Sequence, residues 1–411
     1  MNSFLSKVVN LYIIQGSNYL YPLLMIPLFT SYFGMELYGK VAFVQAISMI
    51  VFVFLDFGFN ISLVKIISQK RDVINKLRST LDNVALIKTI TSVIYLLVLV
   101  QSSILLNIEG YVITLLLTPV LQSMTFNWFF IGTENTTSLA IASAISKIST
   151  LIILYYALDN EFGFDVACSI LLLPHVAIFL YSNTYLYKSK YLYSNGMKYV
   201  SWKLAKVIIM NSSSYFLSRL SVLAYTSINT IIVGLVLSDF HVAIYSISEK
   251  IYMAIKGIFQ PITDALYSRM SKVKSLGVFL KTTALSILLG VILISIYYSQ
   301  PYYFLSFFVK NNIDEVKQIV DLFVLCALVS IPSMYLAYPL LGVYLKPNIV
   351  NKTTVYGAVF HTSILTSLLL ITYISSWNIE LESIVLSICI TEFFILSLRL
   401  RYIIKSMFWK S

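Results

Sequence analysis

The chain has 411 residues, of which 58% are hydrophobic and only 11% are charged. A soluble domain carries roughly 25% charged residues, so this composition excludes an ordinary soluble protein. The apolar runs extend over about 20 residues, the length that an α-helix needs to cross a bilayer. They lack the strict alternation of a porin-type strand. We therefore predict an all-α integral membrane protein.

Twelve transmembrane helices are predicted, in two sets of six. The first six span 8–33, 39–64, 83–106, 111–131, 138–158 and 164–187. The second six span 207–237, 242–267, 278–299, 317–344, 353–376 and 384–404. The first run is too long for the apolar core of a signal peptide, and no small-residue cleavage site follows it. We interpret it as an uncleaved first helix.

Lysine and arginine are concentrated in alternate connections and in the carboxyl-terminal tail. The connection after the second helix contains Lys65, Lys70, Arg71, Lys76 and Arg78. The opposite connections are mostly acidic and contain Glu109, Asp159, Glu161, Asp165, Asp239, Glu380 and Glu382, with Lys40, Lys310 and Lys317 as exceptions. Because short cytoplasmic loops collect basic residues, both termini are predicted to be cytoplasmic. The net charge of +11 is then an orientation signal, and nucleic-acid binding is not predicted.

The longest polar connection follows the sixth helix and divides the chain into halves of equal orientation. We predict an N-terminal six-helix lobe at 1–190, a cytoplasmic basic linker at 191–206 and a C-terminal six-helix lobe at 207–411. Parallel repeats of this kind recur in transporters, with the substrate site between the halves. We therefore expect two pseudo-symmetric lobes around a central cavity. No connection is long enough for a catalytic domain, so a transporter is predicted and an enzyme is not.

The cysteines and histidines are scattered along the chain. Their positions are Cys168, Cys326, Cys389, His175, His241 and His361. They show neither the spacing of a metal site nor a disulfide framework. We predict no metal site and no cofactor.

Ionisable residues inside membrane helices usually face an interior cavity and mark a pathway. The candidates are Asp56, Lys88, Lys147, Arg219, Glu249, Lys250, Lys256, Asp264 and Glu392. On the eighth predicted helix, Glu249, Lys256, Gln260 and Asp264 fall on one face at about 100° per residue. Lipid is a poor neighbour for such a face, so we predict a polar, water-accessible cavity.

Arg219 is the most unusual of these charges. It lies within "SSSYFLSRLSVLAY" (212–225), and no other charge occurs between Lys206 and Asp239. Two interpretations remain open, contact with an anionic substrate and a structural ion pair. For Lys88, near a cytoplasmic helix end, reaching the interface is the alternative. For Glu249 and Lys256, the alternative is pairing with each other or with a neighbouring helix.

Two segments near the amino terminus resemble the start of the polysaccharide-biosynthesis flippases. They are "QGSNYLYPLLMIPLFTSYFGMELYGKVAFVQAIS" (15–48) and "DFGFNISLVKIIS" (56–68), and "ITDALYSRMSK" (262–272) resembles the second-half signature. These flippases are the O-antigen (Wzx-type) members of the multidrug/oligosaccharidyl-lipid/polysaccharide exporter superfamily. Many relatives carry an arginine in the stretch that reads "PLFTSYFG" here, where Thr30 and Ser31 stand. Either this basic contact is absent from the N-terminal lobe, or Lys88 or Lys147 replaces it.

The resemblance implies that the protein flips an undecaprenyl-pyrophosphate-linked oligosaccharide across the bacterial inner membrane. Arginine and lysine suit a desolvated pyrophosphate, and hydroxyl and amide groups suit a glycan. The expected pyrophosphate and glycan contacts are Arg219, Lys256, Lys147, Lys88, Gln260, Asn18 and Gln15. The expected coupling carboxylates, for alternating access driven by an ion gradient, are Asp56, Glu249 and Asp264.

The resemblance also implies partners and leaves alternatives. The partners are the lipid-linked glycan, membrane lipid, and the polysaccharide polymerase with other assembly proteins. A cation-coupled multidrug exporter of the same superfamily is the first alternative, and it would favour a net acidic cavity. A membrane polymerase or ligase would need larger periplasmic loops, and a scaffold would not need buried polar faces.

Overall fold

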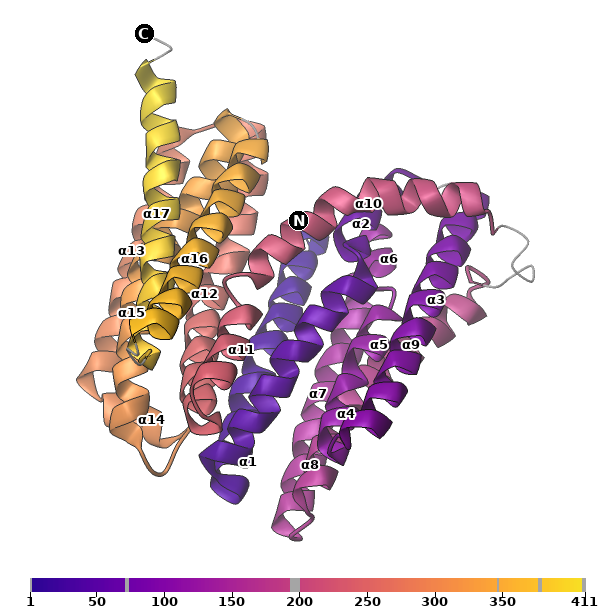
Figure 1. Ribbon diagram of the computed structural model, residues 1–411. Coiled ribbons are helices and arrows are strands. Elements are labelled where there is room, and N and C mark those ends of the chain that lie inside the picture. The colour runs from indigo at the N-terminus through magenta and orange to yellow at the C-terminus, as the bar shows by residue number, and fades with distance from the viewer. Residues whose placement is uncertain (1, 71–73, 193–199, 346, 376–378, 409–411) are drawn as a thin grey trace. The chain divides into compact units, whose positions relative to one another are not determined.

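The computed structural model describes residues 2–70, 74–192, 200–345, 347–375 and 379–408. Within these ranges the chain is helical and contains no β-strand. The elements (Figure 1) are α1 (Asn2–Asp56), α2 (Phe59–Lys70), α3 (Ile74–Leu106), α4 (Gly110–Leu116), α5 (Thr118–Ser123), α6 (Asn127–Gly132), α7 (Thr136–Asp159), α8 (Phe164–Ile170), α9 (Leu173–Lys188), α10 (Trp202–Leu223), α11 (Ser227–Val236), α12 (Asp239–Val273), α13 (Leu276–Ser299), α14 (Pro301–Ser306), α15 (Ile313–Tyr335), η1 (Leu336–Gly342), α16 (Pro347–Ser375) and α17 (Leu381–Phe408). The all-α membrane prediction is confirmed.

The number of spans is consistent with the predicted twelve. Among the described residues, nine ranges are long and apolar enough to cross a membrane, or ten if α10 and α11 form one span. One of the nine is the long α1, which Gly34 interrupts at φ 83° and ψ 174°, so that α1 has the length of two spans. Glycine tolerates this left-handed conformation because it has no Cβ. The 35-residue α12 is also long enough to cross a membrane, but it is more polar and is not among the nine.

Several predicted spans are broken rather than continuous. The predicted span 111–131 consists of α4, α5 and α6, and 164–187 consists of α8 and α9. Pro119 and Pro174 lie in the first turns of α5 and α9, where proline needs no backbone donor. The predicted span 207–237 is interrupted, because α10 ends at Leu223 and α11 begins at Ser227.

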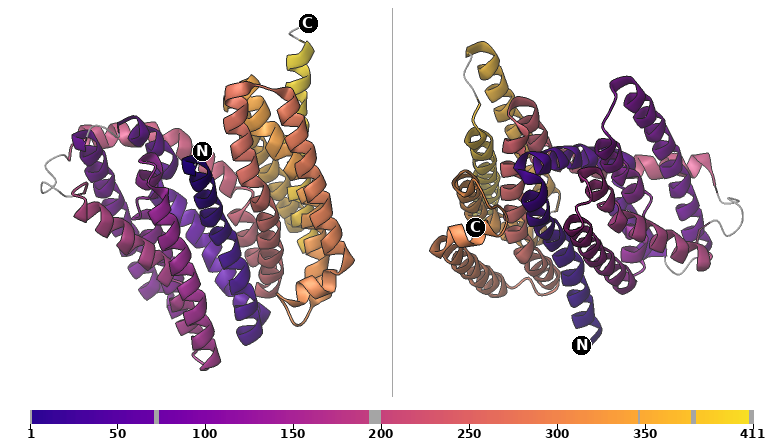
Figure 2. Two further views of the ribbon diagram at one scale, coloured as in Figure 1. Left: turned by 180° about the vertical axis from the view of Figure 1, so that it is seen from behind. Right: turned by 90° about the horizontal axis from the view of Figure 1, so that it is seen from below.

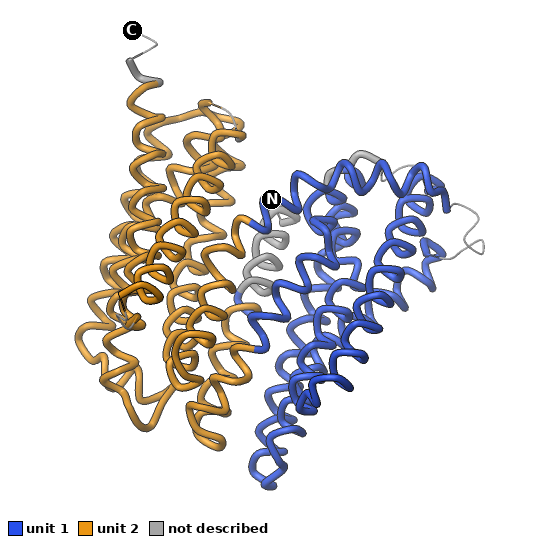
Figure 3. The backbone as a smooth tube through the Cα atoms, viewed as in Figure 1, with its two compact units in different colours: residues 1–17, 44–220 blue, residues 18–43, 221–411 orange. Residues whose placement is uncertain are grey.

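The chain packs as two compact units (Figure 3). Unit 1 comprises residues 1–17 and 44–220, and unit 2 comprises residues 18–43 and 221–411. Most of the first predicted span therefore belongs to unit 2, although it is amino-terminal in sequence. The division predicted from sequence, with lobes at 1–190 and 207–411, stays a prediction.

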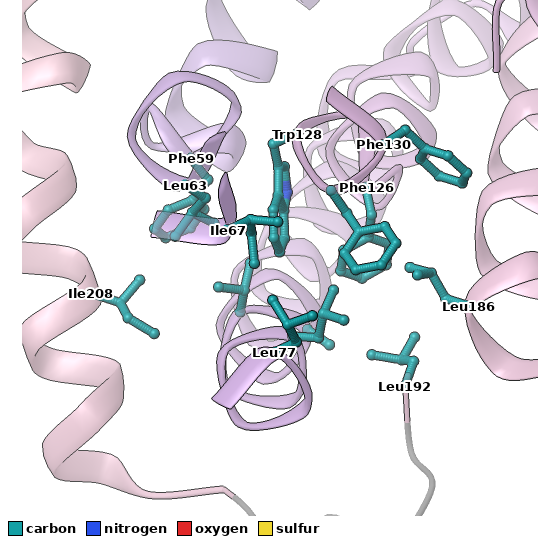
Figure 4. Packing of buried hydrophobic residues seen from close by; sticks show 14 of the residues in the cluster. Phe59, Leu63, Ile67, Leu77, Phe126, Trp128, Phe130, Leu186, Leu192 and Ile208 are labelled. Carbon is teal, nitrogen blue, oxygen red and sulfur yellow. The ribbon is translucent and has the colours of Figure 1, made fainter. Parts of the chain in front are cut away.

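The core of unit 1 is an aromatic and aliphatic cluster (Figure 4). Its largest buried members are Phe59, Phe126, Trp128, Phe129 and Phe130. The turn between α1 and α2 depends on Gly58, which has a φ of 75°. A Cβ at Gly58 would lie 2.7 Å from the backbone nitrogen of Phe216. Glycine thus allows both the turn and the close approach of α10.

Unit 2 is centred on α15. Within this unit α15 lies against α12 and α17, and α16 lies against α17 (Figures 1 and 2). Buried Phe323 of α15 contacts the rings of Tyr245 and Tyr252 of α12. α15 continues into the π-helical turn η1, which contains Pro339. Proline lacks a backbone donor, which accounts for irregular hydrogen bonding there.

Candidate functional site

A fully buried ion pair joins α1 to α3 in unit 1. The Nζ atom of Lys88 lies 3.3 Å from Oδ1 of Asp56, and both side chains are 0% exposed. Lys88 also donates to the backbone oxygen of Ser123 at 2.6 Å, and Asn60 donates its Nδ2 hydrogen to Asp56 Oδ1 at 2.7 Å. Lys88 therefore does not extend to the interface. In this conformation neither member of the pair is accessible to a ligand.

Lys147 and Arg219 are the more accessible intramembrane cations of unit 1. Lys147 of α7 is half-buried, and its Nζ atom lies 3.5 Å from the hydroxyl of Ser17. Arg219 of α10 is also half-buried, and its guanidinium carbon lies 5.7 Å from the ring centre of Phe52. This distance permits a cation–π interaction. Within the described part of the chain, Arg219 has no carboxylate partner, so its charge is available to an anion.

A second intramembrane ion pair joins α12 to α17 in unit 2. Lys256 Nζ lies 3.1 Å from Oε1 of Glu392, and the side chains are 21% and 13% exposed. The hydroxyl of Tyr252 donates to the same carboxylate oxygen at 3.2 Å and accepts from Lys256 at 3.1 Å. The structure therefore agrees with the alternative in which Lys256 pairs with a residue of a neighbouring helix. Unlike the pair in unit 1, this one is partly accessible.

The remaining predicted site residues occupy different environments. Gln260 donates to Asp264 at 2.9 Å, one helical turn away, and Asp264 is exposed. Glu249 is half-buried and has no ion-pair partner among the described residues. Asn18 is exposed and belongs to unit 2. The side chain of Gln15 lies outside the described part of the structure.

A buried histidine network was missed by the sequence analysis. His361 of α16 is 0% exposed, with Nε2 2.9 Å from Oδ1 of Asn229 and Nδ1 3.1 Å from the hydroxyl of Thr391. The amide nitrogen of Asn229 donates to the Tyr225 carbonyl, so Oδ1 faces the ring and Nε2 carries a hydrogen. The network links α11, α16 and α17. No sequence signal marks it, because its members are far apart in the chain.

Replacement of His361 by leucine is expected to lower the thermal unfolding midpoint measured in detergent. The substitution leaves the buried Asn229 oxygen without a donor, at a cost of about 1–3 kcal/mol. His241→Leu is the matched control, because His241 is half-buried near the start of α12 and its hydrogen-bond partner in the described chain is the exposed Ser238 hydroxyl. Equal midpoints for the two variants would contradict a stabilising role for the network.

Arg399 is a further buried cation, close to the basic carboxyl-terminal tail of the chain. It is 8% exposed on α17. It donates to the backbone oxygen of Ser333 at 2.8 Å and to the Ser333 hydroxyl at 2.7 Å. Ser333 lies just before the irregular turn η1. Arg399 therefore contributes hydrogen bonds near the place where the regular helix ends.

These groups can bind ions and polar molecules. Within the ranges that the structure describes, no cluster of three metal-ligating residues occurs. Arg219, Lys147 and Lys256 are cations with access, and Glu249 is a half-buried acid that makes no ion pair in the described chain. Polar groups within membrane helices fit a protein that carries a charged solute through the membrane.

Comparisons with known proteins agree with this description. A family model described as "Polysaccharide biosynthesis protein" matches residues 4–274. A Shigella dysenteriae protein named "Putative O-antigen transporter" is 24% identical over 418 residues, which cover 96% of this chain and 98% of that one. An Escherichia coli (strain K12) protein of the same name is 24% identical over 276 residues, 64% of each chain.

Solved structures share the fold at low sequence identity. An inward-facing multidrug resistance MATE family transporter of the MOP superfamily has a TM-score of 0.67 and 14% identity, covering 96% of this chain and 97% of its own. The lipid II flippase MurJ, in an inward closed conformation, has a TM-score of 0.64 and 11% identity, covering 97% and 87%.

The chain is a multi-pass membrane protein, and its fold is similar to that of a MATE family transporter of the MOP superfamily. The prediction of a transporter rather than an enzyme is confirmed by the relatives. The chain belongs to the polysaccharide biosynthesis protein family, whose model matches about two thirds of its length. The family resemblance inferred from the sequence motifs is thus confirmed.

Proposed function

We propose that this protein flips an undecaprenyl-pyrophosphate-linked oligosaccharide from the cytoplasmic to the outer leaflet of the bacterial inner membrane. The observation that carries the proposal is the relative named as an O-antigen transporter, which aligns over nearly the whole of both chains. The similarity in fold to a lipid II flippase supports it, because that protein is named for moving a lipid-linked molecule. Family membership supports a role in polysaccharide assembly.

The charges suit such a substrate. A pyrophosphate that leaves water needs cations and hydrogen-bond donors to replace its hydration. Arg219 supplies a planar guanidinium that binds phosphate oxygens in pairs, and Lys147 adds a second half-buried cation. Lys256, partly exposed beside Glu392, would donate to glycan or phosphate oxygens when the pair opens. Gln260, Asn18 and Gln15 remain proposed glycan contacts.

Coupling to an ion gradient is the finer part of the proposal. Among the three proposed carboxylates, Glu249 is the best placed, because it is half-buried with no ion-pair partner in the described chain. Asp56 is occupied by Lys88 and Asn60, and Asp264 is exposed and bonded to Gln260. The proposed topology has both termini in the cytoplasm, supported by the basic connections. A polymerase partner stays a prediction.

Reconstituted transport tests the proposal directly. The protein is placed in proteoliposomes with the lipid-linked oligosaccharide of its own host, and molecules reaching the far leaflet are counted with and without a pH gradient. We expect transport several-fold above protein-free vesicles, with a faster rate under the gradient. Absence of transport with the native lipid contradicts the proposal, and a rate insensitive to pH and sodium gradients removes ion coupling.

A multidrug exporter is the second candidate, because the MATE transporter has a TM-score of 0.67. A cavity for cationic drugs favours net negative charge, whereas Arg219 and Lys147 bring positive charge to unit 1. Efflux of a cationic dye from the same proteoliposomes, without transport of the native lipid, would favour the exporter. Arg219 would then be reassigned as a structural residue.

A further inference from the structure

Three connections between membrane spans enclose a pocket in unit 2 that is separate from the charges discussed above. They are the break in α1 at Gly34, the start of α12 and the segment between α14 and α15. The pocket has a volume of about 410 Å³ and is lined by Thr30, Ser31, Phe33, Gly34, Glu36, Phe240 and Lys310 with their neighbours. This volume lies within the range of about 300–1,000 Å³ typical of small-molecule sites. All three connections belong to the side predicted to face outward.

The neighbouring helix α14 places the pocket at the depth of lipid headgroups. α14 connects the membrane-length helices α13 and α15, so it lies at a membrane surface. Its aromatic side chains are exposed, with Tyr302 at 53%, Tyr303 at 79% and, just beyond its end, Phe307 at 55%. Exposed aromatic residues of this kind, tyrosine above all, gather where hydrocarbon meets headgroups. The pocket-lining residues Val309 to Asn312 come shortly after the end of α14 in the chain.

The pocket contains charges of both signs that are not used in the fold. Glu36 and Lys310 both line it and are exposed, and neither makes an ion pair within the described chain. The hydroxyl of Thr30 donates to the backbone oxygen of Phe308 at 2.6 Å and so ties two of the walls together. The remaining walls include the apolar Phe33 and Phe240. The pocket is thus partly apolar, with a separate anion and cation.

We propose that this pocket binds the headgroup of a zwitterionic aminophospholipid from the outer leaflet. The primary ammonium of an ethanolamine headgroup would donate to Glu36, its phosphate would accept from Lys310, and the glycerol region would lie on Phe33 and Phe240. A neutral sugar would neutralise neither charge. A glycerol headgroup would leave Glu36 without a cation, and a choline headgroup has no N–H to donate. This site does not depend on the proposed flipping activity.

Native mass spectrometry of the intact protein in detergent tests the proposal, with phosphatidylethanolamine, phosphatidylcholine and phosphatidylglycerol added separately. We expect phosphatidylethanolamine to bind about fivefold more tightly than the other two lipids, because this is the size of effect that one partly exposed charge pair typically gives. Glu36→Gln should abolish the preference for phosphatidylethanolamine over phosphatidylglycerol. Lys310→Met should weaken the binding of both of these lipids. Glu380→Gln, which removes an exposed charge outside the pocket, is the matched control and should change nothing.

Two further binding measurements distinguish a lipid headgroup from a soluble ligand. Soluble phosphoethanolamine should bind more weakly than the lipid, because the apolar wall then has no glycerol or acyl chain to cover it. The proposal is overturned if soluble phosphoethanolamine binds as tightly as phosphatidylethanolamine, or if all three lipids bind equally. It is also overturned if free glycan, released from the lipid-linked oligosaccharide of the host, displaces phosphatidylethanolamine. The assay contains no flipping substrate, so its failure leaves the proposed function untouched, and failure of flipping leaves this site intact.

Discussion

Arg219→Ala is expected to reduce flipping of the lipid-linked oligosaccharide by about tenfold to a hundredfold. A charge-assisted hydrogen bond contributes about 1.5–3 kcal/mol, and each 1.4 kcal/mol corresponds to a factor of about ten. Arg219 is half-buried and has no carboxylate partner among the described residues, so its loss removes an anion contact and leaves no stranded acid. Arg219→Lys should show an intermediate rate, because lysine keeps the charge and loses the paired donors. The measurement is the initial flipping rate in proteoliposomes at equal protein content.

The stability of the same variants separates transport from folding. Substrate contact predicts that the thermal unfolding midpoint of Arg219→Ala in detergent stays close to that of the wild type. A structural ion pair predicts a lower midpoint together with slower flipping. Arg401→Ala, which removes an exposed arginine of α17, is the control and should affect neither. Normal flipping by both Arg219→Ala and Arg219→Lys would show that the anion role is wrong.

Lys88→Met is expected to destabilise the protein by about 3–5 kcal/mol. Removing one partner of a buried ion pair leaves an uncompensated charge, and this cost exceeds the contribution of the intact pair. Asp56 and Lys88 are both 0% exposed, so water cannot replace the missing partner. The measurement is the thermal unfolding midpoint and the yield of folded protein in detergent.

The double variant Asp56→Asn/Lys88→Met is expected to recover much of that loss. An asparagine at position 56 still accepts from Asn60, as the carboxylate does at 2.7 Å, and no unpaired charge remains. Lys281→Met is the matched control, because Lys281 is an exposed lysine at the start of α13. A double variant as unstable as the single one would mean that packing around Lys88, and not its charge, stabilises unit 1.

Much of the architecture could be predicted because a bilayer restricts the choices. Backbone groups in lipid must bond within their own segment, so long apolar runs become helices. For this reason the predicted span 138–158 agrees closely with α7, and 278–299 agrees with α13. The predicted span 207–237 is instead broken into α10 and α11, because such breaks depend on tertiary packing.

The candidate site was only partly accessible to sequence reasoning. Hydropathy identifies which ionisable residues enter the membrane, and Asp56, Lys88, Lys256 and Glu392 were all recognised as such. It does not identify their partners, since Asp56 and Lys88 lie 32 positions apart and Lys256 and Glu392 lie 136 apart. His361 was missed for the same reason. Its partners come from α11 and α17, and a single histidine in an apolar run has no distinguishing pattern.

The sequence by itself determined the class of protein, its approximate spans and its family, because hydrophobic length and local motifs are properties of neighbouring residues. Only the tertiary structure decided which charges are neutralised and which are available. Lys88 and Arg219 have the same charge in sequence, yet the first is enclosed with Asp56 and the second is half-buried without an acid in the described chain. The physical reason is that the effect of a charge depends on its burial and its nearest partners. Both are set by helices that meet only after folding.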